Sequence, residues 1–123
     1  EVLRTLSEIG IIPVVALEDA ADAAPLAKAL CAGGIPTAEV TFRTGAAAAS
    51  IAAIRQNVPE MLVGAGTVLT VENAEAAVAA GAAYIVTPGI SEAVVRWCLE
   101  HSVPVLPGVQ HRAHRTVLKT QPP

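Results

Sequence analysis

The sequence has few aromatic residues: one Trp, one Tyr and one Phe make up 2% of 123 residues, although 53% of the residues are hydrophobic. A core therefore has to be built from Ala, Val, Ile and Leu. Such residues are typical of a buried parallel sheet that is covered by helices. The length fits one domain, or part of a larger one.

An excess of basic charge is also missing. The net charge is -3, which favours neither nucleic acid nor an anionic membrane as a partner, so a small molecule is the expected ligand. Pro, Gly or charged residues interrupt every apolar run before it reaches the length of a membrane span. The first residues lack the basic-then-apolar pattern of a signal peptide. We therefore expect a soluble cytoplasmic protein without a membrane partner.

Cysteine is scarce as well. Cys31 and Cys98 are far apart, in segments with helical patterns, and neither has the spacing to Cys or His that a zinc site requires. We interpret both as reduced thiols of the core, which is typical of cytoplasmic proteins, rather than as a disulfide or metal ligands.

Apolar segments alternate regularly with segments of helical pattern. The spacing of the predicted strands is roughly 20 to 25 residues, which corresponds to one strand and one helix per unit. The predicted strands are 11–17, 37–44, 61–66, 84–87 and 103–106, and the predicted helices are 2–9, 18–32, 45–57, 71–80 and one that Ser91 caps.

This alternation predicts an α/β fold with a parallel sheet, either a closed (β/α)8 TIM barrel or an open Rossmann-like sheet. Polar residues lie at or just past the carboxyl ends of successive strands, where a barrel collects its active site, so the barrel is favoured; they are Glu39, Arg43, Thr67 and Thr87. Only about five of the eight units are present. The alternative is a fragment that folds only on association, because open sheet edges invite pairing.

The most unusual strand is 37–44. At the period of a strand, Glu39, Thr41 and Arg43 share one face, whereas Ala38 and Phe42 lie on the other. Buried charge is costly unless it is paired, so the polar face predicts a chemical role; the alternatives are an internal ion pair or a polar layer of the barrel.

A glycine-rich segment runs from Val63 to Leu69. Gly64 and Gly66 resemble the start of a dinucleotide-binding motif, but Leu69 stands where the third glycine is required. We interpret the segment as a tight strand exit, at which backbone amides and the Thr67 hydroxyl approach a small anionic ligand.

The composition changes after residue 109. Residues 110–123 hold three of the eight Lys and Arg residues and none of the eleven Asp and Glu residues. We therefore divide the chain into a partial barrel, 1–109, and a basic tail, 110–123, that is foreign to the repeat and disordered. His111 and His114 of this tail have no third ligand nearby, so no metal site is expected.

Six motifs occur in order between residues 2 and 109 and together resemble the KDPG/KHG aldolases, the family of 2-keto-3-deoxy-6-phosphogluconate and 4-hydroxy-2-oxoglutarate aldolases. They are Pro13–Val15, Ala32–Ile35, Ala38–Thr44, Val63–Leu69, Val86–Gly89 and Val105–Val109. The resemblance implies a homotrimeric (β/α)8 class I aldolase that acts on a small keto acid or sugar-acid phosphate, without metal or cofactor. The expected products are pyruvate and glyceraldehyde 3-phosphate, or pyruvate and glyoxylate; an aldolase for the phosphogalactonate epimer is the alternative.

The resemblance also implies roles for individual residues. Glu39 matches the general acid/base, Arg43 and Thr67 match residues that hold the pyruvate carboxylate, and Pro88 matches a residue of the pocket wall, although it would serve equally as a strand terminator.

The family's Schiff-base lysine lies on a sixth strand, beyond Val109. Neither Lys28 nor Lys119 matches it. We therefore expect an amino-terminal part of the barrel that lacks the nucleophile and is inactive on its own.

Overall fold

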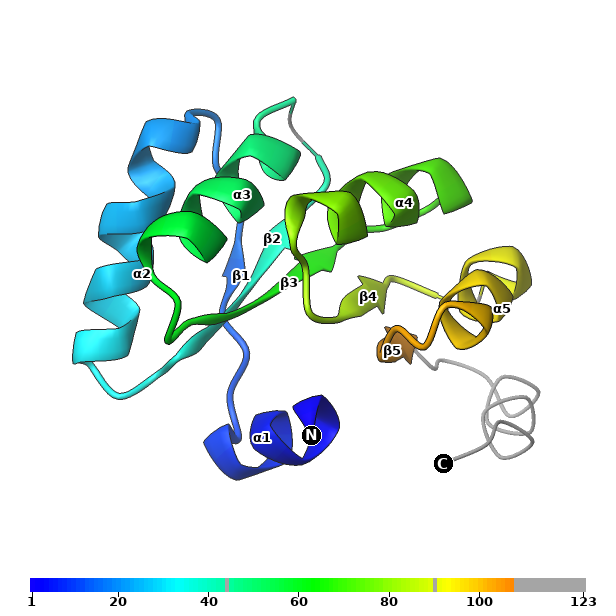
Figure 1. Ribbon diagram of the computed structural model, residues 1–123, viewed down its shortest axis with the longest axis horizontal. Helices are drawn as coiled ribbons and strands as arrows, with labels where there is room; N and C mark the ends of the chain where they lie inside the picture. The colour runs from blue at the N-terminus through cyan, green and yellow to red at the C-terminus, as the bar shows by residue number, and fades with distance from the viewer. Residues whose placement is uncertain (44, 90, 108–123) are drawn as a thin grey trace.

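The computed structural model describes residues 1–43, 45–89 and 91–107, and within them five parallel strands form one sheet in the order β1-β2-β3-β4-β5 (Figure 1). Each strand after β1 is reached through a helical crossover. The strands are β1 (Val14–Val15), β2 (Thr37–Thr41), β3 (Leu62–Gly66), β4 (Ile85–Thr87) and β5 (Val105–Pro107). The helices are α1 (Val2–Ile9), the 3-10 turn η1 (Ala20–Asp22), α2 (Ala23–Ala32), α3 (Ala47–Asn57), α4 (Val71–Ala80) and α5 (Glu92–Glu100).

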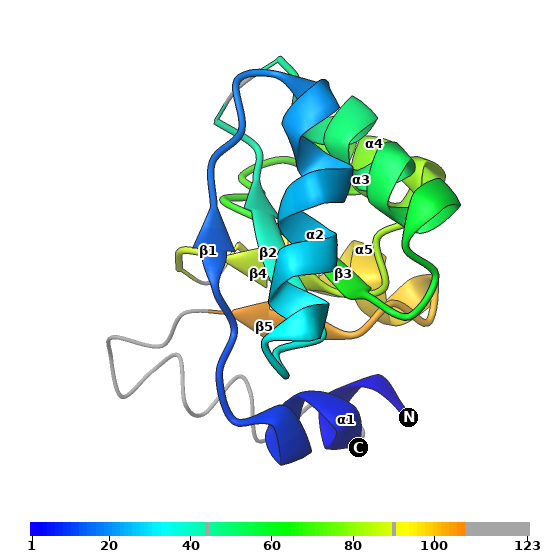
Figure 2. The same ribbon diagram turned by 90° about the vertical axis from the view of Figure 1, so that its left-hand side faces the viewer.

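One side of the sheet is covered by α2, α3, α4 and α5, whereas α1 lies apart from them, near the amino-terminal ends of the strands (Figures 1 and 2). The main core fills the space between the sheet and α2, α3, α4 and α5. Its members are small or branched, as the scarcity of aromatic residues predicts, and include Ala38, Val40, Val63, Ala65, Ala27, Ile51, Ile54, Ala74 and Ala77. Alanines on the helices let the helix axes approach the sheet closely.

The predicted helices 2–9 and 71–80 are confirmed to the residue. Gly10 ends α1 in the left-handed conformation, with a φ of 81°. Thr70 begins α4 by accepting a hydrogen bond from the Asn73 amide, and Ser91 begins α5 by accepting one from the Val94 amide. These ends are local, which is why the sequence pattern locates them.

The predicted helix 18–32 is divided. Asp19 caps the short turn η1 with its side chain, and α2 then starts at Ala23. Pro25 lies in the first turn of α2, where its missing amide hydrogen costs no hydrogen bond.

All five strands are shorter than predicted, β1 and β2 by more than one residue and the others by one. β1 is reduced to Val14–Val15, follows Pro13 and pairs only with β2 among the described residues. β2 ends at Thr41, so Arg43 lies beyond the strand and only Glu39 and Thr41 of the predicted polar face belong to it. The parallel α/β architecture itself is confirmed. The predicted tail 110–123, with His111, His114 and Lys119, lies outside the described residues.

Candidate active site

The two faces of β2 differ as the alternation predicts. Ala38 and Val40 belong to the core under the helices, and Phe42 packs against that core. Glu39 and Thr41 lie on the other face, and both are buried. The polar face is thus turned away from the helices, toward the side where a curved parallel sheet has its interior.

Neighbouring strand β3 presents two glycines to this face. Gly64 is in register with Glu39, and Gly66 is in register with Thr41. A Cβ atom on Gly66 would overlap the carboxylate of Glu39, and one on Gly64 would overlap the ring of Tyr84. Both glycines therefore make room for large side chains that lie across β3.

This contact gives Gly64 and Gly66 a role that the interpretation of the segment as a tight strand exit does not include. Gly64 lies in the middle of β3 and Gly66 at its last position, and neither has a positive φ. Their function in the fold is to lack a side chain, rather than to turn the chain.

Tyr84 and Thr37 form a buried polar pair that sequence reasoning missed. The Thr37 hydroxyl donates to the Leu62 carbonyl oxygen at 2.6 Å, and its oxygen lies 3.0 Å from the Tyr84 hydroxyl. A threonine has one hydroxyl proton, so Tyr84 is the donor to Thr37. Burial raises the pKa of Tyr84 to about 12, with the Thr37 hydrogen bond acting against that shift and the Glu39 charge adding to it. Tyr84 is therefore neutral near pH 7.

The Glu39 carboxyl has the electrostatics of an acid/base group. Its side chain is largely withdrawn from water, with the residue 8% exposed, and within residues 1–43, 45–89 and 91–107 it makes no hydrogen bond or ion pair. Burial raises its pKa above the ordinary value, and the charge of Arg43 acts in the opposite direction. The internal ion pair considered from the sequence is not formed: the described ion pair joins Arg4 and Glu8 on α1.

The remaining predicted residues lie at the carboxyl ends of the strands. Arg43 is exposed two residues after β2, and Thr67 follows β3 directly and is half-buried. Thr67 has a φ of 52°, which is unusual for a β-branched residue and costs of order 1–3 kcal/mol. Strain of this kind often marks a functional position.

Pro88 follows β4 and is exposed. It lines a shallow pocket with Val68, Leu69, Thr87, Gly89 and Ser91. Glu39 and Arg43 do not belong to the wall of this pocket, so the role of Pro88 beside the acid/base candidate stays a prediction.

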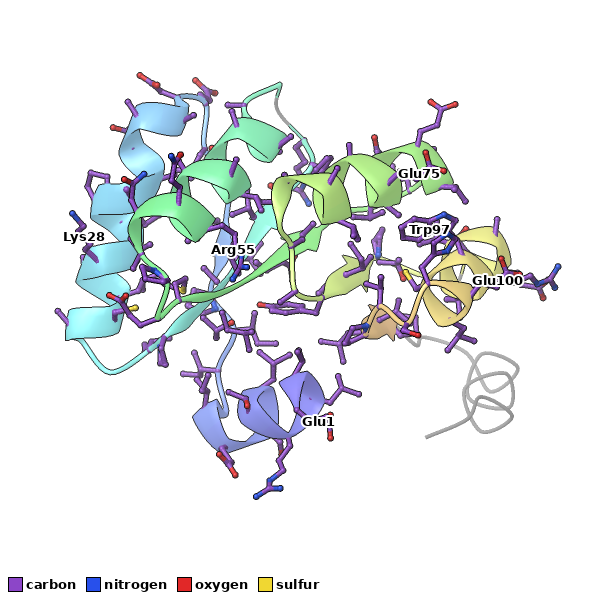
Figure 3. All side chains as sticks on the ribbon, viewed as in Figure 1. Glu1, Lys28, Arg55, Glu75, Trp97 and Glu100 are labelled. Atoms are coloured by element: carbon purple, nitrogen blue, oxygen red, sulfur yellow. The ribbon has the colours of Figure 1, made fainter. Side chains whose placement is uncertain are left out.

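Lys28 is far from this face. It is exposed on α2, and Figure 3 shows its side chain pointing away from the sheet. Since α2 covers the face opposite to Glu39, Lys28 does not approach the acid/base candidate. In the described part of the chain, no group of three or more His, Cys, Asp or Glu residues is arranged to hold a metal ion, and no helix is long and apolar enough to cross a bilayer.

Comparison with known proteins identifies relatives. The family model for KDPG and KHG aldolase matches residues 2–117. A 2-dehydro-3-deoxy-phosphogluconate aldolase from Treponema pallidum is 55% identical over 108 residues, which are 88% of this chain and 51% of the relative. The chain thus spans about half the length of the curated relatives it matches.

Solved structures agree in fold. The 2-keto-3-deoxy-6-phospho-gluconate aldolase of Zymomonas mobilis superposes with a TM-score of 0.82 at 39% identity, over 86% of this chain and 51% of that one. A KDPG aldolase from Legionella pneumophila, with pyruvate captured as a covalent carbinolamine intermediate, gives a TM-score of 0.82 at 37% identity, over 86% and 52%. The five strands therefore correspond to about half of a TIM-barrel chain.

Proposed function

Since the chain belongs to the KDPG and KHG aldolase family, we propose that it carries the acid/base and carboxylate-binding groups of a class I aldolase. The proposed reaction cleaves 2-keto-3-deoxy-6-phosphogluconate into pyruvate and glyceraldehyde 3-phosphate. Cleavage of 4-hydroxy-2-oxoglutarate into pyruvate and glyoxylate is the related second reaction, which the name of a KHG/KDPG aldolase from Escherichia coli suggests at 40% identity.

The observation that carries the proposal is the state of Glu39. A carboxyl group without a hydrogen-bonding partner in the described structure, on a polar face and with a raised pKa, is suited to act as a general acid and base. In the proposed reaction Glu39 accepts the proton of the substrate hydroxyl while the adjacent carbon–carbon bond breaks. It then returns a proton to the pyruvate carbon that carried the bond.

Electrons from the broken bond need a sink, which a Schiff base between a lysine and the keto carbon supplies. The position of Lys28 on the outer side of α2 argues against that residue. As the family resemblance implies, we propose that no lysine of this sequence takes the role, so that the chain alone is inactive.

Arg43 and Thr67 are proposed to hold the carboxylate of the keto acid. They follow neighbouring strands, β2 and β3, at the same edge of the sheet. A guanidinium group forms two parallel hydrogen bonds to a carboxylate, and a hydroxyl adds a third. Pro88 is proposed as part of the wall. A homotrimer and a cytoplasmic location complete the proposal; free Cys31 and Cys98 are consistent with that location.

The proposal is tested by titrating the isotopically labelled chain with pyruvate and following its NMR spectrum. We expect shifts at Glu39, Arg43 and Thr67 that are lost in Arg43→Ala. Arg96→Ala is the matched control, because Arg96 is exposed on α5, and it should respond as the parent chain does. Equal responses of both variants, or none in the folded parent, would contradict the carboxylate site.

Reduction with borohydride in the presence of pyruvate tests the nucleophile. A Schiff base is trapped as a stable adduct that intact mass detects and peptide mapping locates. We expect no adduct on Lys28 or Lys119. A stoichiometric adduct on either lysine, lost in Glu39→Gln, would show that this chain supplies its own nucleophile.

A further inference from the structure

The position of the Glu39 carboxylate is not the one that strand pairing alone would give. Glu39 is in register with Gly64, so a side chain that extended straight across β3 would lie over the α-carbon of Gly64. The carboxylate instead lies above Gly66, two residues nearer the carboxyl end of the strand. Something therefore occupies the space above Gly64.

That space is filled by the ring of Tyr84. A Cβ atom added to Gly64 would meet three atoms of this ring. Tyr84 is fully buried and comes directly before β4, so its ring reaches over β3 toward β2. Because the ring is rigid and has only two rotatable bonds, it makes a fixed wall beside the stem of Glu39.

The wall is anchored at its far end. The Tyr84 hydroxyl donates to Thr37, which precedes Glu39 by two residues on the same face of β2, and the Thr37 hydroxyl donates in turn to Leu62 of β3. This chain of hydrogen bonds ties β4, β2 and β3 together at the level below Glu39. Both partners are buried, so moving the ring would leave a polar group unsatisfied.

We propose that Tyr84 is a positioning residue for Glu39: its ring, anchored on Thr37, occupies the space above Gly64 and directs the Glu39 carboxylate toward the carboxyl end of the sheet. Arg43 follows β2 and Thr67 follows β3 at this edge of the sheet. The chemical purpose of this arrangement rests on the proposed function, because Glu39 must face the bound keto acid to exchange protons with it. A ring beside the Glu39 stem also adds to the burial that raises the pKa of Glu39.

The test uses the two glycines as reporters and needs no substrate. In a pH titration of the labelled parent chain, ionisation of Glu39 should perturb the NMR signals of Gly66 more than those of Gly64. Arg43 acts on the Glu39 carboxyl, and Glu39 acts on Tyr84. Of these three groups, only Glu39 changes its charge between pH 4 and 8.

Tyr84→Leu removes the ring. We expect the Gly64 response to grow relative to that of Gly66 and the midpoint of the Glu39 titration to move to lower pH, since water enters. Ile85→Val is the matched control: Ile85 is the next residue, is equally buried, and packs in the helix-side core. It should lower stability without changing either readout. An unchanged ratio of the two glycine responses in folded Tyr84→Leu would overturn the proposal.

Thr37→Val decides the matter if Tyr84→Leu does not fold. It removes the acceptor of the Tyr84 hydroxyl but leaves both large side chains over β3. We expect a smaller change of the glycine responses in the same direction; no change would overturn the anchored wall. Because neither variant is assayed for pyruvate binding, a failed carboxylate site and a failed positioning role give different results.

Discussion

The carboxylate of Glu39 lies over the α-carbon of Gly66, and no side chain on β3 fits beneath it. The two residues belong to neighbouring strands and are offset by two positions in the register. This offset places the acid/base candidate near the carboxyl ends of β2 and β3. The absence of a side chain at Gly66 is therefore as important to the candidate site as the carboxylate itself.

Gly66→Ala tests this relationship. The new Cβ would force the Glu39 side chain from its position, and overpacking of this kind costs typically 1–3 kcal/mol. We expect denaturant unfolding to show such a loss, and the pyruvate-induced NMR shift at Glu39 to disappear. Gly45→Ala is the control, since a Cβ there meets nothing within 4 Å. Equal stability of both variants would contradict the close approach.

Glu39 also predicts how stability depends on pH. Its pKa is raised in the folded chain, so the native state binds more protons than the unfolded state between the ordinary and the raised value. Stability from this group is therefore fully present at lower pH and is lost as the pH rises through that window. Thermal unfolding from pH 4 to 8 should show Glu39→Gln gaining stability over the parent toward neutral pH, with the difference vanishing at the acid end. A constant difference across the range would contradict the raised pKa.

Substitution of Thr67 should affect the stability of the chain and its binding of pyruvate in opposite directions. Thr67→Gly removes the strain of a φ of 52°, so we expect a chain that is as stable as the parent or more stable, by up to about 1 kcal/mol, yet has lost part of its response to pyruvate. Ser102→Gly is the control, because Ser102 has a φ of 57° and lies before β5, away from the carboxyl ends. It should gain stability and keep the full response; parallel losses of pyruvate response in both variants would contradict a role for the Thr67 hydroxyl.

Ser50 offers a test outside the site. Its hydroxyl is buried in α3 and, within the described residues, has no hydrogen-bonding partner. Ser50→Ala removes this unsatisfied group and improves helix propensity, so we expect a gain of about 1 kcal/mol in the free energy of unfolding. Ser7→Ala in α1, where the serine is exposed, should gain only the propensity contribution, about 0.5 kcal/mol. Destabilisation by Ser50→Ala would show that the hydroxyl has a partner.

The sequence predicts the architecture well because its signals are local. Alternating apolar and helical patterns indicate the parallel α/β fold, and caps such as Thr70 and Ser91 locate helix ends. The division of β2 into a core face and a polar face also follows from its residues alone. The roles of Glu39, Arg43, Thr67 and Pro88 were implied by family motifs and stay predictions until the variants are measured.

Strand ends were less predictable than helix ends. β1 and β2 are much shorter than the segments predicted for them, because a strand lasts only as long as its neighbour provides hydrogen bonds. The strands that pair are distant in the chain, so no residue within one strand segment indicates where its pairing ends.

What the sequence by itself determined is the order of strands and helices, the family, and which residues of β2 face the helices. Tertiary structure alone decided that Gly64 lies under Tyr84 and that Gly66 lies under Glu39. It also decided that Thr37 accepts a hydrogen bond from the Tyr84 hydroxyl. Those contacts depend on the register of three strands. The paired residues are at least 20 positions apart, and a shift of one residue would turn each side chain to the opposite face.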